Sequence, residues 1–152
     1  MHVFRLSRKK YANQLNGRGA AKYGNRWNSK GVEVVYTAES RALAMAEIIV
    51  HLNLAILPSD YMMLQIEIPS EIKIQVLNIE SLSENWNVYP QYMETQKLGD
   101  EFIDAFEACV LKVPSAVVQG DFNYLINPHH PEFKKIEIIN ATPFPFDKRI
   151  FQ

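Results

Sequence analysis

Short apolar runs recur along this chain, and most of them have the length of β-strands. The clearest is Tyr61–Ile68, in which Leu64 and Ile66 alternate with polar residues. This two-residue period places the apolar side chains on one face of a sheet and the polar ones on the other. The predicted strands cover residues 2–6, 32–37, 61–68, 72–79, 108–113, 116–118, 124–127 and 135–139.

Helical spacing replaces this alternation after Thr37, a residue type that caps helix N-termini. Leu43 and Ala46 fall on one face of the predicted helix, which ends near Leu54, before Pro58. Apolar residues continue around the rest of this segment, so we expect the helix to be buried on most of its circumference.

Predicted strands outnumber predicted helices and follow one another along the chain. A second helix is expected over residues 99–106, whereas 7–29 and 80–96 have the character of loops, the latter with short helical pieces. This order favours an α+β fold with a mixed, mainly antiparallel sheet and flanking helices over a doubly wound nucleotide-binding fold. At 152 residues, a single domain over residues 1–152 is expected.

Composition narrows the class of protein. The 47% hydrophobic content supports a real core, but no apolar run approaches the ~18 residues of a membrane span. The first residues, Met-His-Val-Phe-Arg-Leu, have the pattern of a strand and not of a signal peptide. Cys109 is the single cysteine, so no disulfide framework is possible and an inert buried thiol is expected. We therefore expect a cytoplasmic protein without membrane contact.

The net charge of −1 at pH 7 hides an uneven distribution along the chain. Half of the 16 basic residues fall within the first 30 positions, and no acidic residue precedes Glu33. Glycines interrupt this stretch, which suits a pyrophosphate or a nucleic-acid backbone, with a solvated loop as the alternative. Because nucleic-acid-binding proteins are more often basic overall, we favour pyrophosphate over nucleic acid. These basic residues are Arg5, Arg8, Lys9, Lys10, Arg18, Lys22, Arg26 and Lys30.

Glu47 is the one carboxylate in the apolar run from Ala42 to Val50. Burial of an ionised carboxylate is costly unless a partner or a wet cleft receives it, so such a residue is either paired structurally or used chemically. Its position alone leaves both interpretations open. His51 follows one helical turn later, and we expect a local hydrogen bond with Glu47 rather than a metal site.

Several familiar chemistries lack their motifs in this sequence. No phosphate-loop Gly-Lys-Ser/Thr is present, and no nucleophile elbow surrounds Ser115. His129 and His130 are adjacent in a polar loop, which is poor geometry for a metal without further ligands. We expect no metal site.

Six sequence pieces stand in order along nearly the whole chain. They are Phe4-Arg5-Leu6, Gly24-Asn25-Arg26-Trp27-Asn28, Tyr36-Thr37-Ala38-Glu39-Ser40, Ala44-Met45-Ala46-Glu47, Val113-Pro114-Ser115-Ala116-Val117-Val118 and Asn123-Tyr124-Leu125-Ile126-Asn127-Pro128. Together they resemble the RES domain, a family named for its Arg, Glu and Ser, whose members are toxins of bacterial toxin–antitoxin pairs that consume NAD. The resemblance implies a fold similar to that of ADP-ribosyltransferase toxins, in which a split mixed sheet holds NAD in a cleft.

The resemblance also implies site residues, because the family's Arg, Tyr, Glu and Ser fall on Arg26, Tyr36, Glu47 and Ser115. Arg26 would bind the NAD pyrophosphate through its guanidinium fork, and Tyr36 would stack on nicotinamide or the adjacent ribose. Glu47 would stabilise the oxocarbenium-like transition state as nicotinamide leaves, with Ser115 positioning Glu47 or the ribose. Second-rank candidates for NAD binding are Arg5 and Asn127, whose alternative roles are within the sheet and in a turn.

The resemblance leaves the acceptor open. Water would give hydrolysis, inorganic phosphate would give phosphorolysis and a protein side chain would give ADP-ribosylation; we rank NAD degradation by water or phosphate first. The implied partner is an Xre-type helix-turn-helix antitoxin that holds the toxin inactive in a hetero-oligomer, so the toxin chain itself needs no nucleic-acid contact. Rival hypotheses are an RNA-binding or RNA-cleaving module that uses the basic N-terminal segment, and a degenerate domain that only binds its partner.

Overall fold

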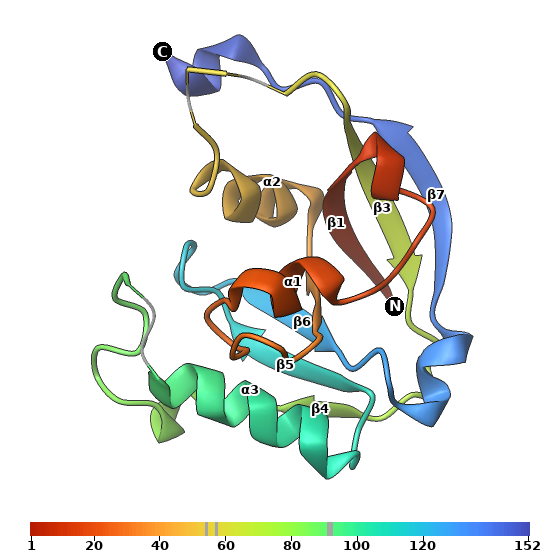
Figure 1. Cartoon of the computed structure of the whole chain (residues 1–152), viewed down its shortest axis with the longest axis vertical. Coiled ribbons are helices and arrows are strands. Elements are labelled where there is room, and N and C mark those ends of the chain that lie inside the picture. Colours follow the sequence, from red (N-terminus) through yellow and green to blue (C-terminus); the bar gives the residue numbers. More distant parts are fainter. Residues whose placement is uncertain (54, 57, 91–92) are drawn as a thin grey trace.

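The computed structural model describes residues 1–53, 55–56, 58–90 and 93–152. Within these residues, seven strands form one sheet in the order β4-β5-β6-β2-β1-β3-β7 (Figure 1). Neighbouring strands are antiparallel except for β4 and β5, so the α+β class and the mixed, mainly antiparallel sheet are confirmed. The strands are β1 (His2–Arg8), β2 (Val35–Ala38), β3 (Tyr61–Glu67), β4 (Ile74–Val76), β5 (Val110–Pro114), β6 (Phe122–Ile126) and β7 (Glu137–Pro143).

The sheet is split between β1 and β2. These two strands pair at a single position, Phe4 with Ala38, whereas β1 pairs with β3 along its whole length. On its other side, β2 pairs with β6 from Val35 to Ala38. The sheet therefore consists of two parts, β4-β5-β6-β2 and β1-β3-β7, which are joined only by the Phe4–Ala38 pair. This is the split sheet that the resemblance implied.

Different helices cover the two parts of the sheet. α2 (Arg41–Ile49) packs on β1 and β3, and α3 (Met93–Ala105) packs on β5 and β6. α1 (Arg18–Tyr23) lies between them in Figure 1. None of the helices in the described part of the chain has the length and apolar content needed to cross a membrane. The 3₁₀ helices are η1 (Lys9–Tyr11), η2 (Ile79–Ser81), η3 (Pro131–Lys135) and η4 (Lys148–Phe151).

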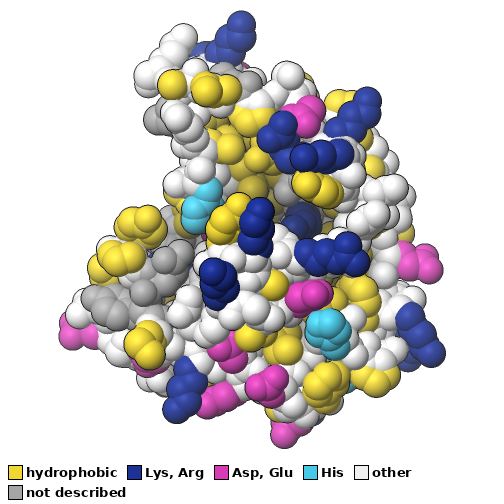
Figure 2. All heavy atoms as spheres, in the orientation of Figure 1, with side chains coloured by type: hydrophobic (Ala, Val, Ile, Leu, Met, Phe, Trp, Pro, Cys, Tyr) yellow, Lys and Arg dark blue, Asp and Glu magenta, His cyan; other side chains and the backbone are white. Residues whose placement is uncertain are grey.

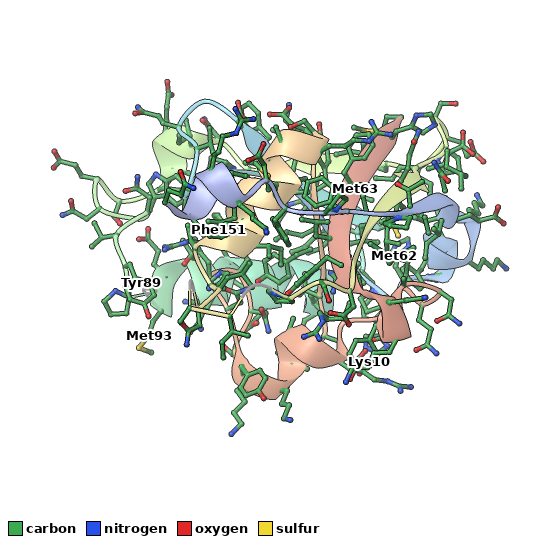
Figure 3. The ribbon with its side chains drawn as sticks, turned by 90° about the horizontal axis from the view of Figure 1, so that it is seen from above. Lys10, Met62, Met63, Tyr89, Met93 and Phe151 are labelled. Carbon is green, nitrogen blue, oxygen red and sulfur yellow. The ribbon has the colours of Figure 1, made fainter. Side chains whose placement is uncertain are left out.

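Side chains of β3 alternate between the two faces of the sheet, as the period of two predicts. Met63 lies beneath α2 with Phe4, whereas its neighbour Met62 packs against the cluster around Leu64 and Ile66 on the opposite face (Figure 3). The sheet thus has core on both faces.

The start of α2 differs from the prediction. The Thr37 hydroxyl donates to the Tyr124 carbonyl oxygen at 2.7 Å inside the sheet, so Thr37 is not the cap. Ser40 is the cap instead, because its Oγ accepts the Leu43 N–H at 3.1 Å. Thr37 remains in β2, and the helix begins three residues later than a Thr37 cap would allow.

The burial and the end of α2 also differ from the prediction. Leu43 and Ala44 are buried, but Ala42 is exposed and Val50, just after the helix, is 57% exposed. Burial on most of the circumference is therefore wrong. The helix ends at Ile49 and the predicted end, Leu54, lies outside the described residues.

Local polar contacts account for other errors of prediction. The predicted strand 116–118 is absent because Ser115 Oγ accepts the N–H groups of Val117 and Val118, at 3.1 and 3.0 Å, and turns the chain. The predicted strand 72–79 shrinks to β4, which pairs in parallel with β5. α1 was not predicted at all, and α3 begins at Met93 instead of Gly99.

Candidate active site

Glu47 is held by neutral hydrogen-bond donors from the other part of the sheet. Its Oε1 accepts the Ser115 hydroxyl at 2.7 Å and the Asn123 side-chain amide at 2.6 Å. Ser115 directly follows β5, and Asn123 lies on β6. No described residue donates a hydrogen bond to Oε2. The carboxylate is therefore fixed through one oxygen, and the other is left for a ligand.

Glu47 forms part of the wall between two adjoining chambers, each of about 390 Å³. That volume lies within the range of small-molecule sites, roughly 300–1,000 Å³. We name them the Arg5 chamber and the Arg26 chamber, because each contains one of these arginines and lacks the other. Figure 2 shows the surface hollowed at the left of the view. Both chambers are lined by Asn25, Tyr36, Glu47, His51 and Asn123.

The Arg26 guanidinium supports one rim of its chamber. Nη1 donates to the Trp86 carbonyl oxygen at 2.7 Å and Nη2 to that of Val88 at 3.3 Å. Burial lowers the pKa of Arg26, while the charge of Glu47 acts in the opposite direction. A guanidinium has five N–H donors, so Arg26 retains donors for an anion. Beyond it, Tyr89 lines the same chamber and is 79% exposed (Figure 3).

The Tyr36 hydroxyl is already engaged. It donates to Asn28 Oδ1 at 2.7 Å and accepts the Trp27 N–H at 3.0 Å. Burial raises the pKa of Tyr36, so the side chain stays a neutral phenol. The ring, which borders both chambers, is the part available to a ligand.

Asn28 was not predicted as a site residue, yet it organises the segment that carries Arg26. It is fully buried, and its Nδ2 donates to the carbonyl oxygens of Ala20, Ser29 and Val32. The available sequence signal was an asparagine at the end of the Gly-Asn-Arg-Trp-Asn piece, because an amide that becomes buried has to be hydrogen-bonded.

α3 fixes the same segment from the outside. Gln96 Nε2 donates to the Asn25 carbonyl oxygen at 3.0 Å, and Asp100 Oδ1 accepts the Ser29 N–H at 2.9 Å. Gly99 lies against the backbone of Trp27, where an added Cβ would come within 1.7 Å of the carbonyl oxygen. The position of Arg26 therefore depends on α3.

The structure brings some predicted residues together and leaves one out. Glu47, Tyr36, Arg26 and Arg5 line the cleft, and Ser115 stands behind Glu47. Asn127 lines neither chamber; it is fully buried, donates to the Ile103 carbonyl oxygen at 3.0 Å and accepts the His129 N–H at 3.0 Å. These contacts correspond to the structural alternative for Asn127.

Two residues of the shared wall carry further corrections. His51 borders both chambers, but no hydrogen bond joins it to Glu47 among the described residues, so that prediction is wrong. Asn123 was missed as a partner of Glu47. The sequence signal for it was an amide side chain at the start of the apolar run of β6. In the structure, Asn123 is 8% exposed.

The described residues offer neither a metal cluster nor a cysteine nucleophile. No group of three His, Cys, Asp or Glu side chains gathers there to hold a metal ion. Cys109 is fully buried, and burial raises its pKa to about 12, so the thiolate that a nucleophile requires is not formed near neutral pH.

Comparison with known proteins identifies relatives along the whole length of the chain. The sequence model of the RES domain matches residues 2–147. A protein named "Toxin Res" from Photorhabdus laumondii is 36% identical over 152 residues, which are 99% of this chain and 97% of that protein. A protein named "Prs ADP-ribosylating toxin" from Sphingobium sp. is 36% identical over 143 residues, or 93% and 89% of the two chains.

A solved structure shares the fold at low sequence identity. A chain in the crystal structure of the M. tuberculosis MbcT–MbcA toxin–antitoxin complex matches with a TM-score of 0.75 and 15% identity. The match covers 99% of this chain and 86% of the other. The family match, the relatives and the split sheet agree, and the chain belongs to the RES domain family.

Proposed function

We propose that this chain is the toxin of a toxin–antitoxin pair and that it cleaves the bond between nicotinamide and ribose in NAD. The observation that carries this proposal is the Glu47 carboxylate, which Ser115 and Asn123 hold in the wall between two chambers with one oxygen free. The relatives named as toxins support the same function.

Glu47 is placed to stabilise positive charge during this cleavage. The bond between ribose C1′ and the nicotinamide nitrogen breaks, and its electron pair leaves on nicotinamide, which becomes neutral. Positive charge then builds on the ribose, and a preorganised carboxylate in a partly desolvated cleft stabilises it. Because the leaving group is already a cation, no acid is needed to protonate it.

The other residues bind and orient the substrate. Arg26 binds the pyrophosphate with its remaining N–H groups, and the Tyr36 ring packs on nicotinamide or the ribose. Ser115 contacts Glu47 and lines neither chamber, so it is a positioning residue. No step requires a metal.

Transfer of ADP-ribose to a protein is the second candidate function. The specific observation in its favour is the Sphingobium relative named "Prs ADP-ribosylating toxin". The first chemical step, loss of nicotinamide, is common to both functions. They differ only in whether water, phosphate or a protein side chain attacks C1′.

An antitoxin is the partner that this function requires. The similar chain of known structure is part of a toxin–antitoxin complex. We propose that the partner of this chain is of the Xre type and covers the cleft, which keeps NAD away from Glu47.

Nicotinamide release from NAD by the purified protein tests the function. The Glu47→Gln variant keeps the shape of the side chain and loses its charge, so kcat should fall by about 100- to 1,000-fold while NAD still binds. Glu101→Gln is the matched control, because Glu101 is exposed on α3, where it pairs with Lys97 at 3.9 Å. A fully active Glu47→Gln variant would contradict the role of Glu47. RNA cleavage without nicotinamide release would favour the RNA rival.

A further inference from the structure

Tyr89 is a large ring that the fold leaves exposed at the Arg26 chamber. It lines this chamber and is 79% exposed. Among the described residues, no aromatic ring and no cation packs against the Tyr89 ring. The nearby rings of Trp27 and Trp86, by contrast, are buried and lie 5.9 Å apart. The Tyr89 ring therefore has a face available for a planar ligand.

The backbone that carries Tyr89 is attached to Arg26. The carbonyl oxygens of Trp86 and Val88 accept the two Arg26 N–H groups at 2.7 and 3.3 Å. Tyr89 directly follows Val88, and consecutive Cα atoms lie only about 3.8 Å apart. Figure 3 shows Tyr89 at the periphery of the molecule. Its ring is thus placed beside the group that Arg26 binds, on the side that faces solvent.

The chemistry of NAD gives this position an occupant. The pyrophosphate of NAD joins two nucleosides, one with nicotinamide and one with adenine. When the nicotinamide ribose contacts Glu47 and the pyrophosphate contacts Arg26, the adenosine has to continue beyond Arg26. Of the aromatic residues that line the Arg26 chamber, Trp27 is buried and Tyr36 is shared with the Arg5 chamber. Tyr89 is the one left for the adenine ring.

Tyr23 is the comparable residue of the other chamber. It lines the Arg5 chamber and is 77% exposed, close to the value for Tyr89. Its ring already has a cation over it, because Lys22 Nζ lies 5.2 Å from the ring centroid. The Arg5 chamber also lacks Arg26, to which we assign the pyrophosphate. These two differences favour Tyr89 as the residue that contacts adenine.

We infer that Tyr89 stacks on the adenine ring and that the enzyme thereby selects a dinucleotide over nicotinamide mononucleotide (NMN). This inference rests on the proposed function and names a part of the substrate that the cleavage itself does not use. Stacking of a base on an aromatic side chain strengthens binding by about tenfold or more. Because adenine lies far from the bond that breaks, this energy lowers KM and leaves kcat unchanged.

Nicotinamide release from NAD and from NMN, measured side by side, tests the assignment. Tyr89→Ala should raise KM for NAD by about tenfold at nearly constant kcat. With NMN, which has no adenine, kcat/KM should change by less than about twofold. An equal loss with both substrates would show that Tyr89 only supports the shape of the cleft, and it would overturn the inference. So would a Tyr89→Ala variant with the KM of the wild type for NAD.

Three further variants serve as controls. Tyr89→Phe keeps the ring and should retain the wild-type KM for NAD. Tyr11→Ala removes an exposed tyrosine of η1 that lines neither chamber, and both substrates should react as with the wild type. Tyr23→Ala tests the reverse orientation of NAD. A raised KM for NAD in this variant, with a normal Tyr89→Ala, would place adenine in the Arg5 chamber and overturn the inference.

Binding of ADP-ribose separates this inference from the proposed function, because ADP-ribose contains no nicotinamide to cleave. In titration calorimetry, Kd for ADP-ribose should rise by about tenfold in Tyr89→Ala and stay constant in Tyr11→Ala. This result would support the adenine site even if NAD were not cleaved. Equal binding by the wild type and Tyr89→Ala, or no binding by either, would overturn the site even if NAD cleavage were established.

Discussion

At the scale of single residues, the cleft contains charges that neutral groups hold in place. Glu47 receives its hydrogen bonds from a serine and an amide, and Arg26 gives two of its own to backbone carbonyl groups. Neither forms a close ion pair with the other, since no salt bridge between them is present among the described residues. Each charge therefore keeps free capacity for a substrate that carries both a cation and a pyrophosphate.

Removal of the Ser115 hydroxyl tests this arrangement. A hydrogen bond to a charged group contributes about 1.5–3 kcal/mol, so Ser115→Ala should lower kcat for nicotinamide release by about 10- to 100-fold. KM for NAD should stay nearly constant, because Ser115 does not line the chambers. Ser81→Ala, in an exposed 3₁₀ turn, is the control. A raised KM with unchanged kcat would show that Ser115 acts on binding instead.

The sequence identified residues whose chemical type is unusual for their surroundings. Glu47 was visible because it interrupts an apolar run, and Arg26, Tyr36 and Ser115 were placed by the family resemblance. Asn123 was not predicted as a partner of Glu47, because an amide at the start of a strand is common. Only the pairing of β6 with β2 brings Asn123 close to Glu47. A residue's chemistry is local, but its partner is set by the tertiary fold.

At the scale of elements, the positions of the site residues depend on contacts that the sequence does not reveal. β1, β3 and β6 were predicted because short apolar runs, with alternation in β3, are local features of the sequence. β4 was misjudged because its length depends on pairing in parallel with a strand 36 residues later, Ile74 with Val110. The predicted start of α2 was wrong because Thr37 and Ser40 both suit an N-cap. The Thr37 hydroxyl is bonded to the Tyr124 carbonyl oxygen within the sheet, which leaves Ser40 to cap the helix.

α3 offers a test at this scale. Gly99→Ala should reduce the free energy of unfolding by about 1–3 kcal/mol, because the new methyl group would overlap the Trp27 carbonyl oxygen. It should also raise KM for NAD, since the segment with Arg26 must shift. Gly19→Ala is the stability control: its Cβ meets nothing within 4 Å, and a helical alanine should add about 0.5–1 kcal/mol. Equal stability of Gly99→Ala and the wild type would contradict the close contact.

At the scale of the whole molecule, the basic N-terminal segment does not form one continuous binding surface. Arg5 and Arg26 line separate chambers, and Arg8 pairs with Asp60. The remaining basic side chains of the segment are exposed, and Figure 2 shows Lys and Arg spread over this face. With a net charge of −1, the molecule also lacks the overall attraction expected of a nucleic-acid-binding protein.

Reversal of the exposed charges on α1 separates NAD chemistry from RNA binding. Arg18 and Lys22 are exposed on this helix, and neither lines a chamber. Exposed charges are screened over about 8 Å at physiological salt, so Arg18→Glu with Lys22→Glu should change KM for NAD by less than about threefold. A nucleic-acid site on this segment would instead lose most of its affinity, since phosphate contacts dominate such binding. Nicotinamide release and RNA binding, measured on the same preparation at two salt concentrations, decide between them. Loss of RNA binding together with loss of toxicity, at unchanged NAD turnover, would favour the RNA-binding hypothesis.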